Sequence, residues 1–179
     1  MEMEFSRYNN QAFGYERFEY LYLEDTLADA ERIRQTHEKI CGFFEGVSIQ
    51  KQPYSAVYGE HILFLILELL KLYDRRKDTT ILDIVIQLLD FLSEKDASQV
   101  DLYQINRLQT EKRRRKLNPE EIQYLSSMKS KGIPAQYQLA TNILLESFYE
   151  AQLIYDQLCP EEKEVFASYP IINLWKSKG

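Results

Sequence analysis

Two apolar runs occupy the middle of the chain, and both have helical spacing. In the first, residues 62–70 (ILFLILELL), only Glu68 is polar, so a helix there would be apolar on almost every side. The second run covers residues 81–92, and its polar positions step by four, three and four into one narrow stripe: Asp83, Gln87, Asp90 and Glu94. Helices of this kind are stable in water only when other helices surround them. The pattern predicts a central helical hairpin over residues 55–95, covered by the rest of the chain.

Start and stop signals predict further helices on both sides of this hairpin. An amphipathic helix is expected over residues 15–44, Ser55 is expected to cap the first hairpin helix, and Thr79 or Thr80 the second. Ser98 is expected to begin a helix that becomes basic toward its end. These signals, together with the absence of strand alternation, predict an all-α fold.

The last third of the chain carries the clearest helix signals. Asn118, Pro119 and Glu121 have the spacing of a capped helix start, and Gly132 marks its expected end. Apolar positions then recur at threes and fours from Tyr137 to Leu158, which predicts one long helix after Pro134. A short helix is expected over residues 160–168, followed by an apolar tail that should dock on the core.

Composition agrees with a globular helical protein of one domain. The chain has 179 residues, 45% of them hydrophobic and 28% charged, and no Gly-, Ser- or Pro-rich stretch divides it. We therefore expect a single domain over residues 1–179, a compact bundle or array of about five to seven helices, with residues 1–14 as an aromatic-rich arm. The acidic start (MEMEF) and the shortness of the apolar runs predict a cytoplasmic protein without a membrane span.

The sequence shows no catalytic or metal-binding signature. It has two histidines, His37 and His61, without the Glu-x-x-His pairs of di-iron bundles, and its two cysteines, Cys41 and Cys159, lack the spacing of metal ligands. We therefore expect no cofactor, no metal and no catalytic site.

One short motif offers a different hypothesis. Arg32 and His37 form an Arg-x4-His spacing that resembles the motif of HEPN-type ribonucleases, although Ile33 replaces a residue that is often polar there. The resemblance implies a metal-independent ribonuclease in which Arg32 stabilises the phosphate charge and His37 transfers the proton. The competing interpretation is that Arg32 is solvated and His37 is packed.

Charge is distributed unevenly along the chain. Residues 1–100 carry 18 acidic and 11 basic side chains, whereas residues 101–179 carry 10 and 11, for an overall charge of −6. An acidic surface repels nucleic acid phosphates, so nucleic acid is an improbable partner except at a local basic patch. Such a patch exists in five consecutive cations: Lys112, Arg113, Arg114, Arg115 and Lys116. They either bind an acidic partner or nucleic acid, or complement the end of a helix and pair with nearby carboxylates.

Aromatic residues are crowded near the start of the chain. Phe5, Tyr8 and Phe13 in the arm would supply large contact area at low entropic cost, although core packing is the commoner use of such residues. The leading hypothesis is a non-enzymatic protein-binding module (an inhibitor, immunity protein or adaptor) that binds another protein through an acidic or aromatic surface. The ribonuclease and the local basic patch are the alternatives.

Overall fold

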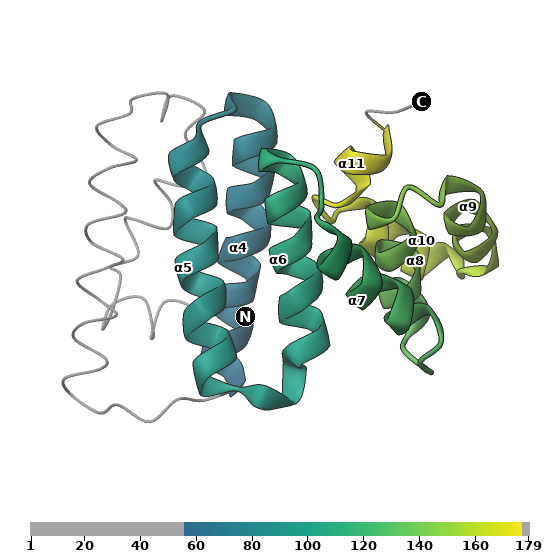
Figure 1. Ribbon diagram of the computed structural model, residues 1–179, viewed down its shortest axis with the longest axis horizontal. Helices are drawn as coiled ribbons and strands as arrows, with labels where there is room; N and C mark the ends of the chain where they lie inside the picture. The colour runs from purple at the N-terminus through teal and green to yellow at the C-terminus, as the bar shows by residue number, and fades with distance from the viewer. Residues whose placement is uncertain (1–55, 177–179) are drawn as a thin grey trace. The chain divides into compact units, whose positions relative to one another are not determined.

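The computed structural model describes residues 56–176 (Figure 1). This part of the chain forms eight α-helices, one short 3₁₀ turn (Ala97–Gln99) and no strand, which confirms the all-α prediction. The helices are α4 (Ala56–Arg76), α5 (Thr79–Lys95), α6 (Val100–Arg114), α7 (Pro119–Lys129), α8 (Ala135–Leu144), α9 (Phe148–Gln157), α10 (Pro160–Ala167) and α11 (Ile172–Lys176).

The chain divides into two compact units, with the boundary between Leu88 and Leu89. The described part of the first unit is Ala56–Leu88, and that of the second is Leu89–Lys176. The expectation of one domain over the whole chain stays a prediction.

The apolar hairpin predicted from the sequence is present. Within the first unit, Figure 1 shows α4 and the first part of α5 (residues 79–88) running antiparallel beside each other, with only Lys77 and Asp78 between them. Lys77 makes the reversal with a left-handed φ of 60°, and its N–H donates to the Tyr73 carbonyl at 2.7 Å. Most apolar side chains of both helices are buried, whereas Phe64 remains 41% exposed. In the predicted polar stripe, Asp83, Asp90 and Glu94 are exposed, whereas Gln87 is half-buried.

The helix caps next to the hairpin differ from the sequence prediction. The Asp78 carboxylate, not Thr79 or Thr80, accepts the Thr80 N–H (2.9 Å) at the start of α5. Ser98, the expected start of the next helix, lies within the 3₁₀ turn before α6, and Asp96 caps this turn by accepting the Ser98 N–H (2.9 Å). A carboxylate accepts from the backbone more strongly than a neutral hydroxyl oxygen. The proposed cap Ser55 lies outside the described residues.

The second unit has one hydrophobic core built by α6 to α11. Its fully buried side chains include Leu125, Leu139, Ile143 and Phe166, and α8 contacts α6, α7, α9 and α11. The helix α7 begins as predicted, with a capping box in which Asn118 accepts from the Glu121 N–H and Glu121 accepts from the Asn118 N–H. It ends at Lys129, three residues before Gly132.

The long helix predicted after Pro134 is two helices, which corrects that prediction. A Schellman motif ends α8: the Glu146 N–H donates to the Ile143 carbonyl (3.1 Å) and the Ser147 N–H to the Asn142 carbonyl (2.9 Å). Glu146 takes the left-handed conformation, with φ of 59°, that glycine usually occupies. Because no glycine marks this break, the apolar periodicity alone predicts one continuous helix.

The apolar tail docks on the core, as the sequence predicts. Ile171 and Ile172 are buried, and Trp175 meets Tyr155 edge to face, with ring centroids 5.7 Å apart. The tail also forms α11, which the sequence did not predict. This helix and the break between α8 and α9 bring the described part of the chain to eight helices rather than the five to seven expected for the whole protein.

Candidate partner-binding surface

The first cation of the basic segment 112–116 holds the end of another helix. Lys112 Nζ donates to the Leu144 carbonyl at 2.9 Å and pairs with the Glu146 carboxylate at 2.9 Å. The carbonyls in the last turn of a helix have no partner within the helix, so an ammonium group beside them is stabilising. Lys112 therefore stabilises the break between α8 and α9.

The second cation, Arg113, completes a buried polar ladder along α6. Gln109 donates to the Asn106 side chain at 2.8 Å, and Arg113 donates to the Gln109 backbone carbonyl at 2.9 Å. The other end of the guanidinium donates to the Pro170 carbonyl at 2.8 Å. Asn106 and Gln109 are each 3% exposed, so their hydrogen bonds form away from water. Arg113 thus ties α6 to the segment that leads into α11.

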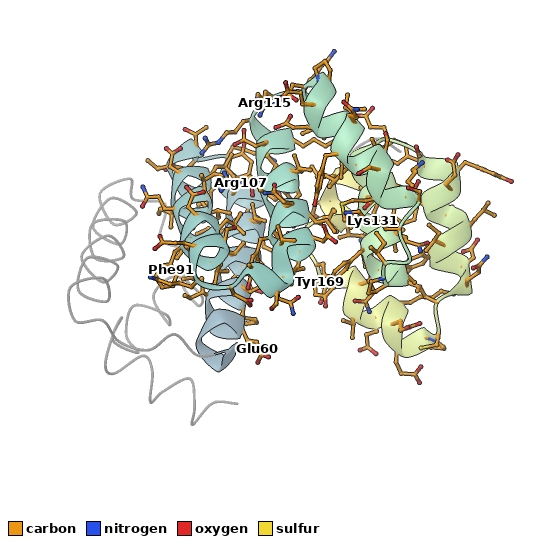
Figure 2. All side chains as sticks on the ribbon, turned by 60° about the horizontal axis from the view of Figure 1, so that its bottom comes forward. Glu60, Phe91, Arg107, Arg115, Lys131 and Tyr169 are labelled. Atoms are coloured by element: carbon orange, nitrogen blue, oxygen red, sulfur yellow. The ribbon has the colours of Figure 1, made fainter. Side chains whose placement is uncertain are left out.

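The fourth cation, Arg115, lies at the end of α6 (Figure 2). It makes a two-pronged ion pair with Glu121 at the start of α7. The two N–O distances are 2.8 and 2.7 Å. This hydrogen bonding, followed by that from the Asn118 backbone, lowers the pKa of Glu121. The same pairing raises the pKa of Arg115.

Replacing Glu121 by glutamine should make stability less dependent on pH. The lowered pKa of Glu121 means that its ion pair contributes above the pKa of the unfolded state and is lost as the pH falls through the folded-state pKa. A glutamine side chain keeps the capping geometry but not the charge, and water screens the partly exposed ion pair, so we expect E121Q to cost about 0.2–1 kcal/mol at pH 7. The difference in the free energy of unfolding between E121Q and the wild type should disappear at acidic pH.

The measurement is urea unfolding at neutral and acidic pH. Glu120→Gln is the matched control, since Glu120 is the exposed neighbour in the same helical turn. A gap between the wild type and E121Q that does not change with pH would contradict the assigned ion pair.

The structure brings only some of the predicted site residues into view. Lys112, Arg113 and Arg115 bind carbonyls or carboxylates of this chain, and Lys116 is exposed. Lys112, Arg113 and Arg115 therefore have the helix-end and ion-pair role that the sequence offered as the alternative to ligand binding. The other predicted residues lie outside the described residues: Phe5, Tyr8, Phe13, Arg32 and His37.

A second surface, which sequence analysis did not single out, lies on α9. Its Tyr149 is 74% exposed and its Leu153 47% exposed, one helical turn apart. Ala151, on the opposite side of the helix, is fully buried, and α9 packs on α8. We call Tyr149, Leu153 and the exposed residues beside them, Glu150, Gln152 and Asp156, the α9 ridge.

The α9 ridge stands out from the other exposed apolar residues. Six large apolar side chains are exposed in the part of the chain that the structure describes, and only Tyr149 and Leu153 share a helix. The others are Phe64, Val100, Ile122 and Val165. A signal for the ridge was present in the sequence, because Tyr149 and Leu153 fall off the apolar stripe that includes Ala151 and Tyr155.

Other titratable groups of the second unit are used to join helices. The Tyr124 hydroxyl donates to Asp101 at 2.9 Å, and Lys131 Nζ lies 3.7 Å from the same carboxylate. Burial and this hydrogen bond raise the pKa of Tyr124 well above its ordinary value. Tyr137 also has a raised pKa, first from burial and then from Tyr169 and Asp101. These contacts connect Asp101 on α6 to Tyr124 on α7 and to Lys131, two residues beyond the end of α7.

Cys159, the cysteine within the described residues, is exposed at the start of α10. The Glu162 backbone favours its thiolate, but the Glu161 and Glu162 carboxylates and desolvation leave its pKa raised. This is the opposite of the lowered pKa that activates a nucleophilic thiol. Between residues 56 and 176, no group of three or more His, Cys, Asp or Glu side chains is placed to hold a metal ion. Within the same range, no helix has both the length and the apolar content that crossing a bilayer requires.

No protein-family model, curated protein or solved structure matches this chain.

Proposed function

We propose that this protein is a non-enzymatic protein-binding module whose α9 ridge is a docking surface. The observation that carries the proposal is the exposure of Tyr149 and Leu153 on one helical face, although the same helix buries Ala151 completely. Exposed apolar side chains scattered singly are ordinary, whereas an exposed aromatic next to an exposed aliphatic residue at i, i+4 is a compact contact surface. Tyrosine is enriched among the residues that dominate binding energy at interfaces.

Two further observations support binding rather than catalysis. The α9 helix is held firmly, since α8 packs along it and the Schellman motif with Lys112 fixes its entry. A rigid helix loses little conformational entropy on binding. In addition, the shifted pKa values have structural causes. Capping hydrogen bonds lower the pKa of Asp96, and the bonds from Arg115 and the Asn118 backbone lower that of Glu121. Burial raises the pKa values of Tyr124 and Tyr137, and the bond to Asp101 adds to the shift of Tyr124.

Replacing Tyr149 and Leu153 together by alanine should weaken partner binding strongly without unfolding the protein. Loss of two central contacts corresponds to at least about 2 kcal/mol, or about 30-fold in affinity. The experiment places a photocrosslinking residue at Gln152, identifies the crosslinked protein in the native cell, and titrates that purified protein against wild type and variant.

The control is Val165→Ala, because Val165 has the same 47% exposure as Leu153 but lies on α10. Weakened binding in Tyr149→Ala/Leu153→Ala, with Val165→Ala unchanged, supports the proposal. Equal affinity of all three proteins for the crosslinked partner, or no crosslink at all from the ridge, would overturn it.

A further inference from the structure

The segment that carries the α9 ridge is the most acidic part of the second unit. Residues 145–168 hold six carboxylates and one cation, Lys163. By contrast, the rest of the chain from residue 101 onward holds four carboxylates and ten cations. The near balance of residues 101–179 as a whole therefore hides an acidic segment, residues 145–168, within an otherwise basic part of the chain.

The single cation of this segment is engaged next to the ridge. Lys163 Nζ donates to the Asp156 backbone carbonyl at 3.1 Å and lies over the Tyr155 ring, 5.6 Å from its centroid. It is half-buried and makes no ion pair with Glu150 or Asp156, whereas Glu146 at the start of the segment pairs with Lys112. Glu150 and Asp156 make no ion pair within the described residues, and both are exposed.

These carboxylates lie around the apolar pair in a fixed order. Glu150 flanks the start of the ridge, and Asp156 follows Tyr149 by two turns on the same face of α9. Gln152 donates to Asp156 at 2.7 Å, which holds that carboxylate on the ridge. An apolar centre with an anionic rim favours a partner with the reverse charge and repels acidic proteins and nucleic acid.

We propose that the α9 ridge binds a cationic amphipathic helix of a protein partner, an inference that rests on the proposed function. Tyr149 and Leu153 are separated by four residues, about 6 Å along the axis, which matches apolar side chains at i, i+4 of a facing helix. Lysine or arginine side chains flanking that stripe pair with Glu150 and Asp156. One of these cations can also lie over the exposed Tyr149 ring, because the face of an aromatic ring attracts positive charge.

The test uses synthetic helical peptides of about 18 residues as probes. One carries leucine at the apolar positions and lysine at the polar positions, and the other has glutamate in place of lysine. We expect the lysine peptide to bind the wild-type protein at least about tenfold more tightly than the glutamate peptide. Its affinity should fall with added salt.

A charge-reversed variant tests whether the rim itself attracts the peptide. Glu150→Lys/Asp156→Lys should lower the affinity for the lysine peptide at least about tenfold. The matched control is Glu120→Lys/Glu94→Lys, which reaches the same net charge by reversing one carboxylate in the first turn of a helix and one in a last turn. It should change the affinity by less than about twofold.

The outcomes separate this inference from the proposed function. If both charge-reversed variants lose the same affinity for the lysine peptide, or if neither loses any, the inference of a cationic partner is overturned. The docking surface still stands if Tyr149→Ala/Leu153→Ala loses binding. If that alanine variant binds the lysine peptide as tightly as the wild type, both proposals fail. A dimer of the protein that forms without peptide and disappears in Glu150→Lys/Asp156→Lys would make a second copy the occupant, and would also overturn the inference.

Discussion

Replacing Phe166 by alanine should destabilise the second unit by about 3–5 kcal/mol. Phe166 is 1% exposed in the core formed by α6 to α11, and its ring meets that of Tyr169 edge to face with centroids 5.9 Å apart. Alanine would remove the buried ring and leave a cavity that the surrounding helices fill only in part. The measurement is urea unfolding followed by circular dichroism, with the loss read from the midpoint.

The neighbouring residue supplies the control for this experiment. Val165 is 47% exposed on the same helix, so Val165→Ala should change stability by no more than about 0.5 kcal/mol. If the two variants lost similar stability, the ring of Phe166 would contribute no more to packing than the exposed side chain of Val165. The described core would then be wrong at this position.

Replacing Arg113 by methionine should cost about 2–4 kcal/mol, although the residue belongs to a run of cations that resembles an exposed binding patch. The substitution removes charged hydrogen bonds to the carbonyls of Gln109 and Pro170, and a hydrogen bond from a charged donor contributes about 1.5–3 kcal/mol. Methionine keeps the aliphatic stem, so the loss reports the guanidinium. The measurement is again the free energy of unfolding in urea.

The tail provides a second measurement for Arg113. Trp175 is the single tryptophan of the chain and packs against Tyr155, so a loosened tail should shift its fluorescence toward longer wavelength before unfolding begins. Lys116→Met is the control, because Lys116 is exposed in the same run. Unchanged stability and emission in Arg113→Met would show that the bond to Pro170 does not hold the tail.

The sequence predicted best where local signals and burial agree. The hairpin of α4 and α5 follows from apolar runs with one polar stripe, and α7 follows from the capping box of Asn118 and Glu121. Both are determined by residues close together in the chain. The cap at Asp78 was missed because its carboxylate replaced the hydroxyl expected from Thr79 or Thr80.

Features that depend on distant residues could not be predicted in this way. The break between α8 and α9 uses Lys112, more than thirty residues earlier in the chain, to bind the Leu144 carbonyl. The inward face of α6 carries Asn106, Gln109 and Thr110, all buried, so hydrophobic periodicity is weak there although the helix is central.

The candidate site shows the same limit. The five consecutive cations at 112–116 suggested one basic patch. Their side chains instead point toward different partners, which lie elsewhere in the chain. The α9 ridge was overlooked because charge was averaged over residues 101–179 and because Tyr149 and Leu153 lie outside the apolar stripe. Charge counted over shorter windows would have indicated the acidic segment.

The different partners of Lys112, Arg113 and Arg115 affect how any mutational scan of this protein is to be interpreted. Neutralising the whole run at once would release the end of α8, the tail and the start of α7 together. A partner would then be lost because the protein misfolds, and the result would imitate the removal of a docking patch. In this run, a substitution of Lys116 alone, accompanied by a folding assay, distinguishes a loss of partner binding from a loss of folding.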